Sequence, residues 1–393
     1  MYTISLMKKV LQICAVLWIS IGFLFLTNPV FGASNDSQTS LTQYLQKISE
    51  DKLNAEHKVL ITGESLEYIK SNVILKGQAL NEKDKILDVQ LRRFKALNDY
   101  GQRYTSVKST LTLNKSEASQ QEIALYITDD IEYKFDPGKS LETVYPKESK
   151  QHLFRFQLIE GQWSLVSDEI INGLALALPA SDSPKINENS TIKEIASNEK
   201  PERDHPRKGN NEQIDIIIKA LGSFNPSSTV NYARQYWDNY NSAYRTYNDR
   251  GGDCTNFVSQ ALNWGGWQHK GGWYTNSNYW WYDPVFPWVV EWGNKGESRS
   301  WINVGNYFYW FARNSGRAFN ARYWSDFRIG DTLQVDFNRD GYLDHNALVT
   351  RNDGGGNIYL TYHTNDTLDI PIRDFWARTS GSNYYGTLNY YNY

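Results

Sequence analysis

The chain has 393 residues, with 41 basic and 44 acidic side chains and a formal net charge of −3. This slightly acidic balance argues against nucleic acid as the main partner, because nucleic-acid-binding domains carry a basic stripe. The length is sufficient for two domains.

The first 33 residues have the pattern of an export signal. Lys8 and Lys9 form a short basic region, and residues 10–26 are almost entirely apolar. Small residues before a cut after Gly32 or Ala33 fit signal cleavage, which would leave 39 basic against 44 acidic residues. We therefore expect a secreted or cell-wall-associated protein that meets the membrane only during export. An uncleaved anchor is the alternative, because the apolar run nears spanning length.

Residues 34–180 predict a small α+β accessory domain in which helices cover one face of an antiparallel sheet. Helical spacing and strand alternation occur in the segments 40–57, 86–104, 105–113, 122–135 and 151–166. The domain contains no catalytic motif. His57 and His152 lie in polar sequence, so we expect both to be solvated.

The next segment, 181–212, is rich in polar residues and proline and lacks Phe, Trp and Tyr. Such a composition cannot bury a core and predicts a flexible linker. Residues 213–393 are rich in aromatics and glycine. A helix within 226–247 and later closely spaced strands predict a second α+β domain.

Cys254 is the most informative residue of this second domain. Cys14 lies within the export signal, so the exported chain keeps one cysteine and cannot form an internal disulfide. Asp253 is a typical N-cap residue and 257–262 carries a helical apolar stripe, which places Cys254 in the first turn of a helix. A helix N-terminus lowers a thiol pKa, and its N–H groups can stabilise an oxyanion. We interpret Cys254 as a nucleophile, with a buried structural cysteine as the alternative.

A thiol nucleophile needs a neighbouring imidazole. Residues 344–350 predict a strand with His345 near its start, and the glycine-rich segment 353–356 predicts a turn to a second strand. Folding about this turn places His363 opposite His345, with Asn365 on the same face. Either residue could fix the imidazole tautomer, the orienting role of a third group in a catalytic triad.

The segments 253–260, 344–350 and 362–366 together resemble the amidase-domain family of Gram-positive exported proteins. More distantly, they resemble the papain-like NlpC and CHAP cell-wall hydrolases. The resemblance implies a papain-like cysteine hydrolase domain that cleaves an amide through a thioester, with Cys254 as nucleophile and His345 as general base. The third member is His363 by position or Asn365 by residue type, and we favour His363. The expected substrate is a cell-envelope peptide or peptidoglycan-like molecule, and we expect a monomer.

The segment 336–344 has the layout of a calcium loop just before His345. Its ligands would be the side chains of Asp336, Asn338, Asp340 and Asp344 and the carbonyl of Tyr342. Position 12 is Ala347 instead of glutamate, which excludes a normal EF-hand. We expect a structural Ca²⁺, with a polar β-turn as the alternative, and no cofactor for the chemistry itself.

Nine tryptophans fall between residues 264 and 310. They predict either core packing or a groove that stacks sugars or holds a peptide. The groove reading supports a second hypothesis, an inactive glycan- or peptide-binding module on a hydrolase scaffold. A third hypothesis is an acyl transferase, in which an amine replaces water in the second step.

Overall fold

The computed structural model describes residues 35–64, 74–139, 141–171, 185–186, 190–192, 224–283 and 296–390. The predicted export signal lies outside these residues. Within the described part of the chain, no helix has the length and apolar character to cross a membrane.

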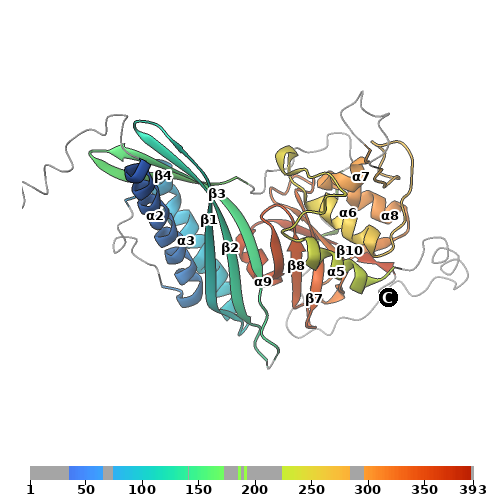
Figure 1. Ribbon diagram of the computed structural model, residues 1–393. Helices are drawn as coiled ribbons and strands as arrows, with labels where there is room; N and C mark the ends of the chain where they lie inside the picture. Colours follow the sequence, from blue (N-terminus) through green and yellow to red (C-terminus); the bar gives the residue numbers. More distant parts are fainter. Residues whose placement is uncertain are drawn as a thin grey trace, which may run out of the picture.

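The described residues form the predicted α+β fold, built on one antiparallel sheet that runs through both halves of the chain (Figure 1). Its strands lie in the order β1 (Arg103–Ala118), β2 (Glu122–Asp136), β3 (Lys147–Ile159), β9 (Thr367–Pro371), β8 (Ile358–Tyr362), β7 (His345–Asn352), β6 (Thr332–Asp336), β10 (Asn383–Asn389) and β5 (Ala318–Asn320). Strand β4 (Gln162–Ile170) pairs with β3 beside this path.

In the N-terminal half, two helices cover one face of the part of this sheet formed by β1 to β4 (Figure 1). The elements are α2 (Asn35–Thr62), α3 (Gly77–Asn98), β1 (Arg103–Ala118), β2 (Glu122–Asp136), β3 (Lys147–Ile159) and β4 (Gln162–Ile170). Leu45, Ile127 and Phe154 belong to the core between the layers. The predicted order of elements is correct. The second helix, predicted over 86–104, is α3 and spans Gly77–Asn98.

The expectation that His57 and His152 are solvated is wrong, since both are buried. His152 shares a buried face of β3 with Phe154, on which its ring stacks. Its Nδ1 lies 2.7 Å from Oδ1 of Asp168. A partner on the neighbouring strand offsets the cost of burying the imidazole, and this partner is not visible in the local sequence.

The C-terminal half packs helices against the strands that continue the sheet. Its helices are α5 (Pro226–Tyr236), η4 (Asn248–Arg250), α6 (Cys254–Trp264), α7 (Arg299–Ile302), η6 (Val304–Phe308), α8 (Tyr309–Asn314), η7 (Trp324–Asp326) and α9 (Ile372–Arg378). Its strands are β5 (Ala318–Asn320), β6 (Thr332–Asp336), β7 (His345–Asn352), β8 (Ile358–Tyr362), β9 (Thr367–Pro371) and β10 (Asn383–Asn389).

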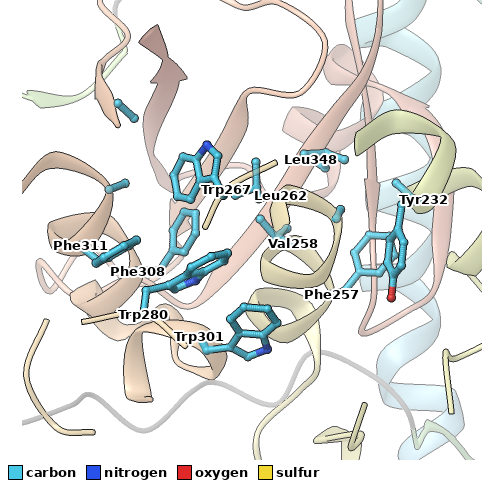
Figure 2. Packing of buried hydrophobic residues seen from close by; sticks show 14 of the residues in the cluster. Tyr232, Phe257, Val258, Leu262, Trp267, Trp280, Trp301, Phe308, Phe311 and Leu348 are labelled. Carbon is cyan, nitrogen blue, oxygen red and sulfur yellow. The ribbon is translucent and has the colours of Figure 1, made fainter. Parts of the chain in front are cut away.

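Helix α6 is surrounded by aromatic side chains (Figure 2). Phe257, Val258 and Leu262 of α6 join a cluster with Leu348 of β7. Trp267, Trp280 and Trp301 in the same cluster are at most 1% exposed. Trp264 and Trp273 are 64% and 66% exposed. Trp267, Trp280 and Trp301 are therefore core residues and do not line the predicted sugar- or peptide-binding groove.

The N-terminal and C-terminal halves contact each other directly through paired strands and a shared cluster of buried side chains. Lys147 and Glu148 of β3 pair with Leu368 and Thr367 of β9. In addition, Tyr359 of β8 packs in one cluster with residues of the N-terminal half. Ile186, within the segment predicted as a flexible linker, is buried against the C-terminal half.

Candidate active site

Cys254 is the first residue of α6, as predicted, but Asp253 does not cap the helix with its side chain. Instead, Asp253 Oδ1 accepts hydrogen bonds from the backbone N–H of Tyr247 and from Asn256 Nδ2, both at 2.9 Å. Oδ2 lies 2.7 Å from His363 Nδ1. The Asp253 carboxylate thus joins the first turn of α6, through the Asn256 side chain, to Tyr247 and His363 of neighbouring segments.

The Cys254 thiol is 4% exposed and lies among hydrogen-bond donors. The Thr255 hydroxyl is 3.9 Å from the sulfur, and the backbone N–H groups of Asn346 and Thr255 also face it. Burial raises the pKa of Cys254 to about 11, although these donors act in the opposite direction. The thiol is therefore protonated at neutral pH in this conformation.

His345 begins β7, as predicted, but its imidazole lies in an aromatic pocket. Its ring centroid is 4.7 Å from that of Tyr362 and 6.1 Å from that of Phe375. Neither ring nitrogen has a hydrogen-bond partner, so the expected hydrogen bond to Cys254 is not formed. Burial lowers the pKa of His345 to about 3, which makes it a neutral imidazole with a free lone pair.

His363 does not lie beside His345, because β7 contains a bulge. Arg351 pairs with Tyr359, and that register would bring His345 and His363 onto one face. Beyond Thr350 the register shifts, and Leu348 pairs with Thr361. A shift of one residue moves side chains to the opposite face. The prediction that His363 orients His345 is therefore not met in this structure.

His363 instead lies between two hydrogen-bond acceptors. Its Nδ1 faces the Asp253 carboxylate and its Nε2 faces the Tyr236 carbonyl, each at 2.7 Å. Because a carboxylate and a carbonyl can only accept, both ring nitrogens carry a proton and the ring is an imidazolium. Although burial opposes the charged form, the hydrogen bond and charge of Asp253 raise the pKa of His363.

The imidazolium is held between two aromatic rings. Tyr240 and Phe257 stack on His363, each with a centroid separation of 4.0 Å. Tyr240 falls within the segment 226–247, for which no catalytic or positioning role was predicted. Its hydroxyl also donates to Asp366 Oδ1 at 2.7 Å, so the same ring anchors the turn that carries His363.

Asn365 lies in the turn between β8 and β9, not on an extended strand. Thr364 and Asn365 have φ values of 70° and 61°, the left-handed region that asparagine tolerates better than most residues. Its Oδ1 is buried and has no hydrogen-bond partner. Thr364 Oγ1 accepts from the Asp253 backbone N–H at 3.0 Å, which links this turn to the start of α6.

The predicted calcium loop forms a turn in which carboxylates accept backbone hydrogen bonds. Asp336 accepts from the N–H groups of Asp340 and Gly341, and Asp344 accepts from that of Phe337. Across the described ranges, no three His, Cys, Asp or Glu side chains converge as metal ligands. Asn338 and Tyr342 belong to the same turn. Calcium binding stays a prediction.

Comparison with known proteins covers the segment that contains all four residues predicted for catalysis. Residues 223–386 match the family model described as "Putative amidase domain". This match confirms the resemblance predicted from the sequence and supports an amidase-type hydrolase. The relation to NlpC and CHAP hydrolases stays a prediction.

Two curated relatives come from Bacillus subtilis (strain 168), and both are described as uncharacterized. YjcM is 24% identical over 209 residues, covering 51% of this chain and 45% of the relative. YhbB is 26% identical over 161 residues, covering 41% and 47%. The chain thus spans about half the length of these relatives.

One solved structure, the intermembrane space region of chloroplast protein ARC6, matches 33% of this chain and 94% of its own. Its identity is 10% and its TM-score 0.24.

The charge of His363 predicts how stability depends on pH. Since the folded pKa of His363 is raised above 6.5, its ion pair stabilises the fold fully below pH 6.5 and is lost as pH rises through the folded pKa. The free energy of unfolding, measured with denaturant between pH 6 and 9, should therefore fall more steeply with pH in the wild type than in His363→Gln.

His269→Gln is the matched control, because burial lowers the pKa of the partly buried His269 instead of raising it. Equal slopes for the wild type and His363→Gln would contradict the imidazolium assignment.

Proposed function

We propose that this protein is a thiol-dependent amide hydrolase, an amidase or peptidase in which Cys254 is the nucleophile. The main support is the position of the Cys254 thiol. It lies at the N-terminus of α6, among hydrogen-bond donors, and within the segment that matches the amidase domain. Donors to sulfur favour a thiolate, and the N–H groups of a first helical turn can stabilise an oxyanion.

His345 is the proposed base. Its neutral imidazole has no hydrogen-bond partner, and a buried unpaired polar group calls for an explanation such as catalysis. The sulfur contacts the backbone N–H of Asn346, the residue that follows His345 in β7, so the thiol lies beside the strand that carries His345. We propose that the imidazole turns from its aromatic pocket towards the sulfur when substrate binds.

The reaction then has two steps. The Cys254 thiol gives its proton to His345 while sulfur attacks the carbonyl carbon. The C–N bond breaks, and the departing amine takes that proton and leaves an acyl thioester. Water loses a proton to His345 and attacks the thioester, which releases a carboxylic acid and restores the thiol. His363 does not act as base in this scheme, because its two nitrogens already donate to Asp253 and Tyr236.

The proposed substrate is a cell-envelope peptide, because the N-terminal pattern favours export. The binding-module hypothesis loses support, since Trp267, Trp280 and Trp301 are core residues. An acyl transferase would use the same cysteine and differ only in the acceptor of the acyl group.

Export is tested by sequencing the N-terminus of protein recovered from the medium or wall of an expressing Gram-positive host. The expected sequence begins at Ala33 or Ser34. Protein found only inside the cell, with Lys8 and Lys9 still present in its N-terminal sequence, would contradict export.

Hydrolysis is tested by incubating purified peptidoglycan with the wild type and with Cys254→Ala, then identifying released fragments by mass spectrometry. We expect new free amino and carboxyl ends with the wild type. The variant should be slower by about 10³-fold or more, since removing a nucleophile leaves only binding and oxyanion stabilisation. An added amine that appears in the product would instead indicate acyl transfer. Equal release by both proteins would contradict the assignment of Cys254.

The roles of the two histidines predict different kinetic losses. His345→Gln should lower kcat by about 10²- to 10⁴-fold, the usual contribution of a general base, with little change in unfolding temperature. His363→Gln should mainly lower the unfolding temperature, because Asp253 loses a charged partner in the interior. A larger loss of kcat in His363→Gln at temperatures where both variants are folded would assign the base to His363.

A further inference from the structure

A backbone hydrogen bond joins the N-terminal half to the turn that carries His363 and Asn365. Ser149 of β3 donates its N–H to the carbonyl of Asp366 at 2.8 Å. Asp366 closes that turn, and its side chain accepts from Tyr240. One strand of the N-terminal half therefore fixes the backbone next to the imidazolium.

Five charged side chains form a largely buried network behind this strand pairing. Arg93 of α3 and Glu148 of β3 come from the N-terminal half, and Asp374 and Arg378 come from α9. Arg93 Nη2 lies 3.0 Å and Arg378 Nη2 lies 2.8 Å from Asp374 Oδ2. Arg378 also donates to Glu148. Lys150 Nζ lies 2.6 Å from the other Glu148 oxygen, Oε2, so three cations and two anions meet at the boundary between the halves.

The network is almost closed to solvent. The Arg93 side chain is 3% exposed, and those of Glu148 and Asp374 are 0% exposed. Although burial opposes ionisation, Arg378 and Arg93 hold the pKa of Asp374 at about 2. Removing one partner of such a network leaves an uncompensated buried charge, so each half keeps the other in place.

The same network sets the position of α9, and α9 lines the pocket of His345. Phe375 lies next to Asp374 in α9, and its ring stacks on the His345 ring at a centroid distance of 6.1 Å. Tyr104 of the N-terminal half also donates to Asp374 Oδ2 at 2.6 Å. A shift of α9 would therefore change the surroundings of the proposed base.

We propose that the N-terminal half is a positioning element of the active site: Ser149 and Glu148 hold the β8–β9 turn and α9, and through them His363 and His345. The matched amidase segment begins at residue 223, so Ser149 and Glu148 lie outside it and their partners in the turn and α9 lie within it. The catalytic part of this inference rests on the proposed hydrolase function, whereas the positioning part can be measured without turnover.

The sharpest test is Ser149→Pro in the full chain, because proline removes the N–H that bonds to Asp366. Ser149→Ala is the matched control, since it removes the hydroxyl and keeps the N–H. The ring resonances of His363 and His345, observed by NMR with isotope-labelled histidine, should shift in Ser149→Pro and stay near the wild-type values in Ser149→Ala. The kcat on the amide substrate should fall by about 10- to 100-fold with a smaller change in KM, the loss typical of misplaced catalytic groups.

Glu148→Gln supplies a second variant if the proline variant fails to fold. It should shift the His345 ring resonances and lower kcat, because Arg378 loses a charged partner. Glu117→Gln serves as its control, since Glu117 pairs with Lys115 on the surface. Glu117→Gln should change neither quantity.

Unchanged histidine resonances in folded Ser149→Pro or Glu148→Gln would overturn the positioning proposal. A wild type without amidase activity would overturn the proposed function and leave the NMR result to decide the positioning of both histidines. Shifted resonances with unchanged kcat would limit the N-terminal half to a stabilising role and contradict the catalytic part.

Discussion

The buried ion pair between His363 and Asp253 connects three segments around the candidate site. His363 belongs to the β8–β9 turn, Asp253 precedes α6, and the second nitrogen of His363 bonds to the last residue of α5. The Asp253 carboxylate also accepts hydrogen bonds from the Tyr247 backbone N–H and from the Asn256 side chain. The position of Cys254 therefore depends on a charged pair that is shielded from water by Tyr240 and Phe257.

The environments of the two histidines give them opposite properties. Burial opposes the charged form of both histidines. The Asp253 carboxylate nevertheless raises the pKa of His363, whereas burial among aromatic rings lowers the pKa of His345. A fixed cation can hold structure, and a neutral imidazole can take a proton. Burial raises the pKa of the Cys254 thiol, and in the proposed mechanism it stays protonated until substrate and imidazole reach it.

The sequence predicted a cysteine at a helix start and a histidine at a strand start, and both lie there. It also placed a polar group on the next strand, whereas His363 and Asn365 lie in the turn after β8. It could not predict the bulge at Thr350, because nothing in the local pattern marks the extra residue. In the structure, Thr350 Oγ1 bonds to Asp369 and Thr361, partners that come from two other strands. This single inserted residue separates His345 from His363.

Long-range pairing also explains what the sequence could not show about the N-terminal half. Arg93, Glu148 and Asp374 resemble surface charges in a linear sequence, and only their meeting across the β3–β9 boundary makes burial tolerable. Likewise, the crowded tryptophans did not distinguish a core from a groove, because aromatic composition is the same in both.

The most direct measurement is rapid quenching of the protein with a slow amide or activated ester substrate, followed by mass spectrometry of the peptide that contains Cys254. The account predicts an acyl group on Cys254 that forms and decays at rates matching turnover, and that is absent in Cys254→Ala. Turnover without any acyl group on that peptide, or with the acyl group on another residue, would contradict a cysteine nucleophile.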